Sequence, residues 1–332
     1  MSILKKYPYL FPLLPLLLIL SLLYYLVIYS RHLLYKWEIL KRYEFSTPII
    51  SIGSLEVGGS GKTPITIHIA QKFIEWGYRV AVISRGYKRK GEELETIQNY
   101  DNWQLYGDEP TMILRRVPEI DVYVSQDRIS AIKYALSQKG YDLFLLDDGA
   151  QYRKLVKCVE ILLLRGKSKL PLPIGELRDG YFLIDRDHII LWKGTDNKMN
   201  RDNFQSKFEL TPSMYVDKDF NGVDNDITLG KKIFAFAGIA YPEEFKQQLL
   251  PYDLVGFQSF PDHKDYTQND VTQIIDIARK NNADLILTTE KDIVKLATFD
   301  FDIPLYALRT IPIIENEEEF FKHLKEKIEG NR

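Results

Sequence analysis

Beyond residue 45 the chain alternates short apolar runs with longer stretches in which apolar residues recur at helical spacing. This alternation is typical of βα units, in which helices flank a buried parallel sheet. The first group of predicted strands covers residues 48–53, 79–84, 143–146, 160–164 and 188–192, with helical stretches between them. The pattern therefore predicts an α/β fold built on a parallel sheet.

Residues 195–230 interrupt this pattern with TDNKMNRDNFQ and DKDFNGVDND, two stretches rich in Asn, Asp and Gly. Such stretches are typical of turns and connections. A second α/β set follows, with strands predicted at 232–237, 252–258, 285–288 and 304–308 and with helices near Glu243, over 268–280 and from Glu315. We therefore predict a first α/β domain over 46–195, a linker over 196–230 and a smaller α/β domain over 231–332, with a cleft between the two domains.

The N-terminal segment has a different character, because residues 10–29 read LFPLLPLLLILSLLYYLVIY and contain no charged residue. About 20 apolar residues suffice for a helix to cross the hydrocarbon core of a bilayer. Lys5 and Lys6 precede this run, and basic residues follow it from Arg31 onward. We predict a retained membrane anchor over 1–45, either as a spanning helix or as an interfacial helix in one leaflet. A cleaved signal peptide is the alternative, since it also combines a basic start with an apolar run.

The composition is that of a folded protein with balanced charge. The 332 residues include 44 basic and 46 acidic side chains, and 45% of the residues are hydrophobic. These values exclude a disordered or collagen-like chain, and they provide no overall positive field of the kind that attracts nucleic acid. We therefore expect no nucleic-acid partner. The single cysteine, Cys158, can form no internal disulfide and no cysteine-based zinc site, which indicates a cytoplasmic body.

Residues 57–63 read VGGSGKT and lie between a predicted strand and the helical pattern of 65–76. A strand, a glycine loop and a helix in this order form the context that a phosphate-binding loop requires. Glycines allow backbone N–H groups to converge on phosphate oxygens, and a helix N-terminus favours negative charge. We expect Lys62 to reach the β- and γ-phosphates of a nucleotide and Thr63 to bind Mg²⁺. The predicted phosphate-binding residues are Gly58, Gly59, Ser60, Gly61, Lys62 and Thr63.

One position departs from the usual phosphate-loop sequence. That sequence has a glycine five residues before the second conserved glycine, and Glu56 stands there in this chain. Only the GSGKT end of the loop fits, so we expect a loop whose first half is rearranged.

Charged residues also follow two other predicted strands. Asp147 and Asp148 end the run DLFLLDDG, at the sheet edge where ligands of open parallel sheets gather. Carboxylates there can hold a metal ion directly or through water. Arg85, in the sequence SRGY, follows a neighbouring strand and could bind a phosphate with both arms of its guanidinium. The alternatives are an Asp pair that starts a turn before Gly149 and a solvated arginine.

Three further polar segments could be either functional or structural. The sequence GDEP leads into a helix, so Asp108 is either an N-cap or a functional carboxylate. His263, in FPDH, follows a strand of the second domain and is one of only five histidines. The sequence TTEKD over 288–292 ends a strand and starts a helix, which is typical of helix capping.

Taken together, these segments resemble the tetraacyldisaccharide 4'-kinases, the lipid A 4'-kinases of Gram-negative bacteria. The resemblance covers most of the chain after residue 46. In chain order its motifs are SIGSLEVGGSGKTP, SRGY, GDEP, LLDDGAQ, LPIGELRDG, FAFAGIAYPEEF, FPDHKDYT and LTTEKDIVKL.

The resemblance implies two α/β/α domains joined by a β linker, with a P-loop NTPase-like parallel sheet in the first domain and a membrane-anchoring helix before it. It implies ATP and Mg²⁺ as cofactors, and an acceptor that is an acylated glucosamine disaccharide 1-phosphate embedded in membrane lipid. The product would be lipid IVA. These expectations place the protein at the inner membrane, with its catalytic body on the cytoplasmic face.

The resemblance also implies roles for individual residues. Asp108, paired with His263, would deprotonate or orient the 4'-hydroxyl of the acceptor, while Lys62 and Thr63 would hold the triphosphate and the metal. Closure of the two domains would then assemble the site. The residues expected around the metal are Thr63, Asp147, Asp148 and Asp179.

Three positions depart from the family's motifs. Tyr152 stands where the aspartate-rich motif usually has a histidine, residues 178–180 read RDG where the family has LRE-P, and Lys264 replaces a second histidine. Each change lies beside the principal residues and not on them.

Two other classes of function stay open at this point. A membrane-tethered nucleotide hydrolase that switches a protein partner would use the same loop, although residues 281–284 read NNAD and match no NKxD base-reading motif. A cytoplasmic small-molecule kinase with an incidental apolar start is the other.

Overall fold

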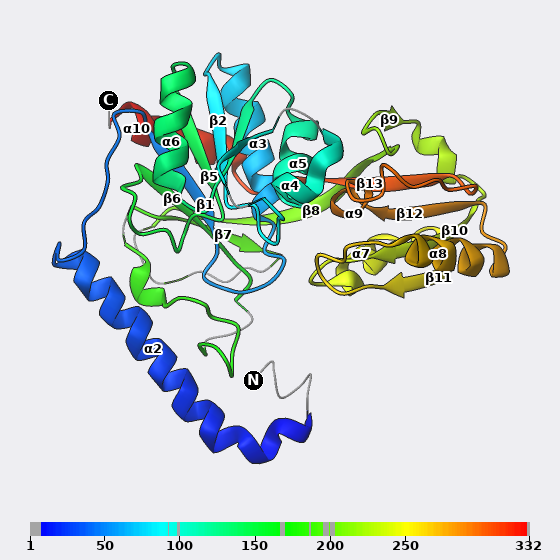
Figure 1. Cartoon of the computed structure of the whole chain (residues 1–332), viewed down its shortest axis with the longest axis horizontal. Coiled ribbons are helices and arrows are strands. Elements are labelled where there is room, and N and C mark those ends of the chain that lie inside the picture. Colours follow the sequence, from blue (N-terminus) through cyan, green and yellow to red (C-terminus); the bar gives the residue numbers. More distant parts are fainter. Residues whose placement is uncertain are drawn as a thin grey trace.

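The computed structural model describes residues 8–91, 93–97, 100–166, 170–185, 187–194, 199 and 203–330, and these residues form two α/β lobes (Figure 1). The strands of the first lobe are β1 (Ile49–Gly53), β2 (Val80–Ser84), β3 (Glu95–Thr96), β4 (Asp121–Val124), β5 (Leu143–Asp147), β6 (Val159–Leu164) and β7 (Ile189–Lys193). Its helices are α3 (Lys62–Glu75), α4 (Trp103–Tyr106), α5 (Asp108–Arg116), α6 (Arg128–Gln138) and α10 (Glu317–Glu329), with short 3₁₀ turns at Tyr100–Asn102 and Tyr181–Leu183.

The second lobe is smaller. It contains β9 (Gly222–Val223), β10 (Lys232–Ala237), β11 (Asp253–Ser259), β12 (Leu285–Thr289), α7 (Pro242–Gln248), α8 (Gln268–Lys280), α9 (Glu290–Ile293) and a 3₁₀ turn at Asn225–Thr228. Two long strands, β8 (Gln205–Val216) and β13 (Leu305–Ile314), run between the lobes. The described strands therefore form one sheet in the order β11-β10-β12-β13-β8-β7-β6-β1-β5-β2-β4-β3, with β9 paired to β8.

The central strands of the first lobe are buried on both faces. All five residues of β1, β2 and β5 are buried, as expected for parallel strands covered by helices on each side. One face packs against α3, α5 and α10, and the other packs against α6. The α/β fold predicted from the sequence is thus confirmed, and all nine predicted strands are present.

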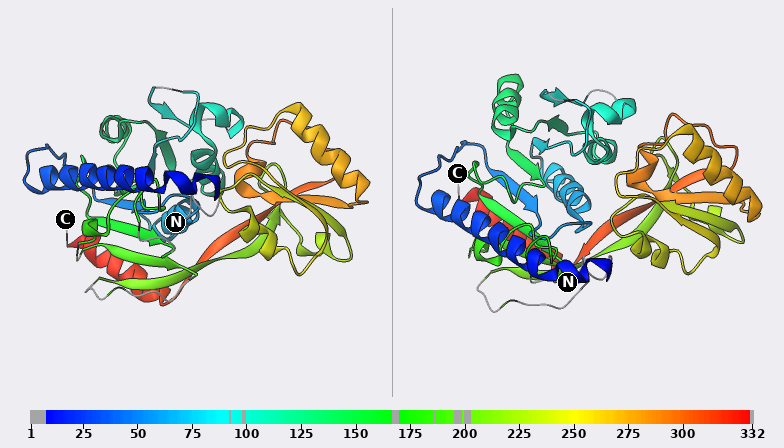
Figure 2. Two further views of the ribbon diagram at one scale, coloured as in Figure 1. Left: turned by 90° about the horizontal axis from the view of Figure 1, so that it is seen from below. Right: turned by 60° about the horizontal axis from the view of Figure 1, so that its bottom comes forward.

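The connection between the lobes is a β structure. β8 and β13 pair antiparallel from Ile314 opposite Phe208 to Ala307 opposite Val216, and the register shifts where Pro212 faces Thr310. A bulge of this kind accommodates a proline, which cannot donate to the ladder. Figure 2 shows the two strands passing from one lobe to the other. The sequence predicted only a linker here, because the segments that flank the 12-residue strand β8 are rich in Asn and Gly and have the composition of turns. Residues 196–198 and 200–202 of that linker lie outside the described residues.

The C-terminal helix α10 returns to the first lobe. Phe320, Leu324 and Ile328 are fully buried in the same apolar cluster as residues of α3 and β6. His68 of α3 also lies 2.6 Å from the carboxylate of Glu317. The segment 231–332 therefore contributes to both lobes, which the hydrophobic pattern alone did not predict.

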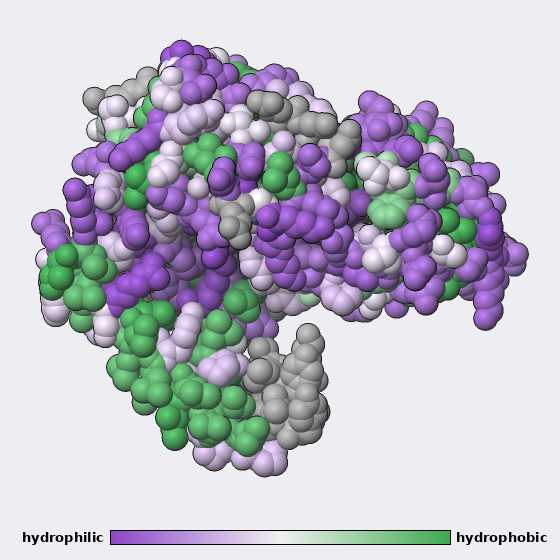
Figure 3. Space-filling model, in the orientation of Figure 1, coloured by the Kyte–Doolittle hydropathy of each residue, from purple (hydrophilic) through white to green (hydrophobic). Residues whose placement is uncertain are grey.

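The N-terminal helix α2 (Leu14–Lys36) projects an apolar surface beyond the otherwise polar body (Figure 3). Its residues include Leu18 and Val27, which are about half to two-thirds exposed. The segment Phe11–Lys36 is long and apolar enough to cross a membrane by length and composition. One side of the helix contacts the body, because Ser21 donates to the carbonyl of Pro171 and Tyr24 to that of Arg178. Lys5 and Lys6 lie outside the described residues.

The placement of α10 makes a prediction about stability. Phe320→Ala should lower the free energy of unfolding by about 3 to 5 kcal/mol, because a fully buried aromatic ring is lost from the first lobe. Lys322→Ala, on the exposed side of the same helix, should change it by less than about 0.5 kcal/mol. Denaturant unfolding in detergent measures both values, and equal effects would show that α10 does not support the core.

Candidate active site

The phosphate-binding loop connects β1 to α3 at the carboxyl edge of the sheet. Gly58 and Gly61 have φ values of 99° and 88°, which side chains other than glycine rarely adopt. A Cβ atom at Gly58 would also lie 2.7 Å from the hydroxyl of Tyr241. The loop thus needs glycine both for its turn and for its close approach to the second lobe. Lys62 begins α3, and the Thr63 side chain is buried beside it.

Glu56 replaces the first glycine of the usual loop and is fully buried. Its Oε2 accepts a hydrogen bond of 2.7 Å from the backbone N–H of Arg165. Burial, with a contribution from Glu176, raises the pKa of Glu56. The start of the loop is therefore fixed to the end of β6 by a side chain where other phosphate loops have a glycine.

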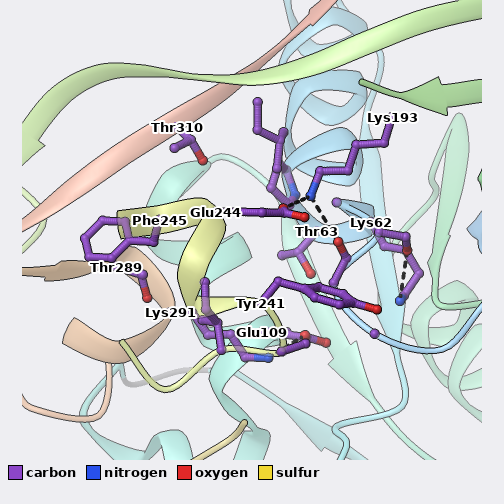
Figure 4. A pocket seen from close by; sticks show the side chains of 18 of the residues that line it. Lys62, Thr63, Glu109, Lys193, Tyr241, Glu244, Phe245, Thr289, Lys291 and Thr310 are labelled. Carbon is purple, nitrogen blue, oxygen red and sulfur yellow. Dashed lines mark hydrogen bonds and ion pairs between the residues drawn. The ribbon is translucent and has the colours of Figure 1, made fainter. Parts of the chain in front are cut away.

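Two cations hold the loop against the second lobe. The Gly59 carbonyl accepts hydrogen bonds from the Arg165 guanidinium at 3.3 Å and from Lys193 Nζ at 3.0 Å. Both cations also bind the carboxylate of Glu244, which belongs to α7. The Arg165 guanidinium stacks 3.6 Å from the ring centre of Tyr241. The dashed contacts of Figure 4 show part of this bridge between the lobes.

Asp147 and Asp148 end β5 next to the loop but have opposite environments. Burial first, and then the negative charges of Glu109 and Asp148, raise the pKa of Asp147 to about 7. Thr66 donates to its Oδ1 at 3.1 Å.

Asp148 has the left-handed φ of 51°. Its carboxylate lies 3.7 Å from Lys62 Nζ and 2.5 Å from the Arg178 guanidinium. Burial alone would raise the pKa of Asp148, but these two cations hold it below its usual value.

Asp108 and His263 meet across the two lobes. Asp108 begins α5, where its Oδ1 accepts a hydrogen bond of 2.9 Å from the N–H of Glu109, and its side chain is only 5% exposed. His263 Nδ1 lies 3.0 Å from Asp108 Oδ2. His263 has a left-handed φ of 57°, and its N–H donates to the carbonyl of Gly238. The pairing that the resemblance implied is therefore formed, and its geometry is set by the backbone on both sides.

Two lysines of the second lobe surround this pair. Lys291 Nζ lies 3.0 Å from His263 Nε2, and Lys295 Nζ lies 3.8 Å from Asp108 Oδ2. Burial alone would raise the pKa of Asp108, but the hydrogen bond with His263 and the charges of Lys291 and Lys295 lower it below its usual value. Asp108 is thus ionised at neutral pH and accepts hydrogen bonds.

One cavity of about 670 Å³ lies between the lobes and brings most of these groups together. It is lined by Gly58, Gly59, Ser60, Gly61, Lys62, Thr63, Asp148 and His263, all of them predicted from the sequence. His263 also lines a smaller pocket of about 110 Å³, and of the two cavities Asp108 lines only this one. Asp147 is buried behind the cavity wall.

Two predicted site residues lie apart from this cavity. Arg85 is exposed, and the cavity lining does not include it. Asp179 is buried and accepts hydrogen bonds from the Arg153 guanidinium at 2.6 Å and from the N–H of Gly180 at 3.0 Å. Its neighbour Arg178 does line the cavity.

The sequence reasoning missed several charged or aromatic residues at this site: Glu109, Arg165, Lys193, Tyr241, Glu244, Lys291 and Lys295. Lys291 belongs to the TTEKD segment that we interpreted as helix capping. Capping does occur there, since Thr289 accepts from the N–H of Asp292. The available signal was the position of the segment at the carboxyl end of a parallel strand, the same kind of position that pointed to Asp147.

The residues present fit a nucleotide with its metal. Backbone and glycines of the loop form a cradle, and Thr63 and Asp148, which line the cavity, supply oxygen ligands of the kind that Mg²⁺ prefers. Within the described part of the chain no group of three or more His, Cys, Asp or Glu side chains could hold a metal by itself.

Comparisons with known proteins point in one direction. The family model of tetraacyldisaccharide-1-P 4'-kinase matches residues 13–329. A tetraacyldisaccharide 4'-kinase of Desulfotalea psychrophila is 33% identical over 316 residues, which cover 87% of this chain and 90% of that one. The enzyme of the same description from Aquifex aeolicus is 33% identical and covers 91% of this chain and 95% of its own. The crystal structure of the apo form of LpxK from Aquifex aeolicus in complex with ATP aligns with a TM-score of 0.80 at 31% identity, covering 94% of this chain and 98% of that one.

Replacing each of the two adjacent aspartates by asparagine should change the free energy of unfolding in opposite directions. The folded-state pKa of Asp147 is about 7, above the ordinary value of 3.8, so the stability it provides is present at low pH and is lost as the pH rises through 7. Asp147→Asn stays neutral and can still accept from Thr66. It should raise the free energy of unfolding at pH 8 by on the order of 2 kcal/mol.

Asp148→Asn is the matched control. Its depressed pKa means that the stability it provides is present at neutral pH and is lost only in acid, so this variant should be destabilised at pH 8. Denaturant unfolding from pH 4 to 8, without nucleotide and with EDTA, compares the two variants. Changes of the same sign would contradict the assigned environments.

Proposed function

This chain belongs to the tetraacyldisaccharide-1-P 4'-kinase family, and on that premise we propose that it transfers the γ-phosphoryl group of ATP to the 4'-hydroxyl of tetraacyldisaccharide 1-phosphate, giving lipid IVA. The observation that carries the proposal is the single cavity that the phosphate loop and His263 both line, with Asp108 bound to His263. A kinase needs these two elements together, because it must bring the triphosphate and the acceptor hydroxyl into line.

In this proposal the triphosphate lies along the loop. Backbone N–H groups and the N-terminus of α3 bind the phosphate oxygens, and Lys62 exchanges its contact with Asp148 for the β- and γ-phosphates. Thr63 and Asp147 or Asp148 would hold a magnesium ion, which would supply positive charge to offset that of the triphosphate. Asp179 is left out of this metal site, since Arg153 already pairs with it. Arg85 is likewise left without a role in nucleotide binding.

The acceptor hydroxyl would donate to Asp108. The lowered pKa makes this carboxylate a weak base, but phosphoryl transfer passes through a loose transition state in which little proton transfer is needed early. Asp108 therefore orients the hydroxyl and takes its proton late, and His263 holds the carboxylate in place. The transferred group ends on the 4'-oxygen, and ADP is the second product.

We propose that the acceptor reaches the cavity from the membrane surface beside α2. Tyr24 of α2 donates to the Arg178 carbonyl at 2.7 Å, and the Arg178 side chain binds Asp148 at the phosphate site. The hydrogen bonds of Ser21, Tyr24 and Arg31 with the polar body occupy one side of α2. A helix tied to a polar body in this way suits an interfacial position in one leaflet. Since ATP is cytoplasmic, we assign the anchor to the inner membrane and the body to its cytoplasmic face.

The catalytic proposal predicts which variants lose phosphoryl transfer. Asp108→Ala should lower kcat by about 10²- to 10⁴-fold, the range typical of a lost acid–base group, and Lys62→Ala should lose transfer together with ATP binding. Phosphorylation of detergent-solubilised tetraacyldisaccharide 1-phosphate measures both effects.

Lys72→Ala, at a half-buried position on α3, and Asp276→Ala, at an exposed position on α8, serve as controls and should keep wild-type rates. ATP hydrolysis that depends on Lys62 without any phosphorylated lipid would contradict the proposal and favour a nucleotide switch.

The membrane proposal predicts the effect of charge on α2. Leu18→Asp combined with Leu22→Asp should release the protein from membranes, because each carboxylate costs up to about 3 kcal/mol in the apolar layer. ATP affinity should be unchanged. The matched control places Asp at Leu229 and Leu250, which are 78% and 72% exposed on the second lobe. Sedimentation with vesicles measures binding, and equal binding of both double variants would contradict an anchoring role for α2.

A further inference from the structure

Lys291 lies beside the Asp108–His263 pair. It stands near the start of α9, at the carboxyl end of β12. Its Nζ is 3.0 Å from His263 Nε2 and 3.0 Å from Glu109 Oε1. It is also 3.6 Å from the carboxylate of Asp262 and 4.0 Å from that of Asp108. Figure 4 shows Lys291 and Glu109 next to each other at the cavity wall.

These contacts determine which ring nitrogen of His263 carries a proton. A lysine ammonium has three donors and no acceptor, so a neighbour at 3.0 Å must accept from it. His263 Nε2 can accept only when it is unprotonated, and in a neutral imidazole the proton is then on Nδ1. Nδ1 lies 3.0 Å from Asp108 Oδ2 and can donate to it. The two contacts on opposite sides of the ring therefore require the same tautomer.

We propose that Lys291 is a positioning residue that fixes His263 in the Nδ1–H tautomer, so that the imidazole donates to Asp108 and holds its carboxylate for the acceptor hydroxyl. The effect on catalysis rests on the proposed function, whereas the tautomer itself does not. With the proton on Nε2, the lone pair of Nδ1 would face the Asp108 carboxylate and the hydrogen bond would be lost.

The charges around Lys291 distinguish this role from direct phosphate binding. Three carboxylates, those of Glu109, Asp262 and Asp108, lie within 4.0 Å of its ammonium. A phosphate drawn to Lys291 would have to lie beside the same three carboxylates. Lys62, at the phosphate loop, is paired with Asp148 alone among the acidic residues whose ion pairs are described. Lys62 is therefore better placed than Lys291 to bind a phosphate.

Two substitutions separate hydrogen bonding from charge. Lys291→Met removes the donor and keeps most of the length, while Lys291→Gln keeps an N–H donor and removes the charge. The proposal predicts that Lys291→Met lowers kcat by about 10- to 100-fold, by analogy with the loss of outer partners that fix the tautomer of metal-bound histidines. Lys291→Gln should recover a substantial part of this loss, and the KM for ATP should change little in either variant.

Histidine ¹⁵N spectra of the full chain in detergent give a readout that needs no catalysis. The wild type should show an unprotonated Nε2 and a protonated Nδ1 for His263, with the signals assigned by their absence in His263→Gln. The Nε2–H tautomer should become populated in Lys291→Met and less so in Lys291→Gln. Thermal unfolding verifies that both variants are folded.

A different pattern would overturn the proposal. If Lys291 bound the γ-phosphate, Lys291→Gln would lower kcat as much as Lys291→Met does. The KM for ATP would rise in both variants, and the His263 spectrum would not change. An unchanged spectrum in a folded Lys291→Met variant refutes the tautomer assignment even if the acceptor is not the proposed lipid. Absence of lipid phosphorylation in the wild type would refute the proposed function and leave the spectra as the test of Lys291.

Discussion

The pairing of β8 with β13 is the constraint on which the rest of the structure depends. The two strands form the only described sheet connection between the lobes, and through it 13 strands become one sheet. With the lobes joined in this way, residues that follow the carboxyl ends of β1 and β5 in one lobe line the same cavity as residues that follow those of β10 and β12 in the other. The phosphate loop and His263 can therefore line one cavity although they lie about 200 residues apart in the sequence.

Charge contacts across the cavity form a second connection between the two lobes, in addition to β8 and β13. His263 meets Asp108, Lys291 meets Glu109, and Arg116 binds Glu290 in a pair whose side chains are each only 6% exposed. Breaking a buried pair by removing one partner is strongly destabilising, since it leaves a charge without compensation. These contacts therefore favour the arrangement in which the lobes are close, and they place charged groups where a triphosphate and a hydroxyl would meet.

The sequence predicted the elements better than it predicted their assembly. Local periodicity located the nine strands and the phosphate loop, and ordered motifs identified Asp108 and His263. Local periodicity did not identify β8, because its polar flanks and Pro212 are typical of a connection. It also did not predict that α10 packs on the first lobe, because that packing is a long-range contact. Arg85 and Asp179 illustrate the same limit, because a motif position does not determine which way a side chain points. Lys291 was visible only as part of a cap, since its partners come from two other segments, those of Asp108–Glu109 and Asp262–His263.

The return of α10 bears on the order in which the protein can form during synthesis. The apolar helix α2 precedes Phe320, Leu324 and Ile328 by nearly the whole of both lobes, yet these three residues complete the apolar layer over β6 and α3. The apolar helix α2 is therefore synthesised long before the first lobe can close its core. The apolar layer behind the phosphate loop is therefore completed only after the residues of the second lobe have been synthesised.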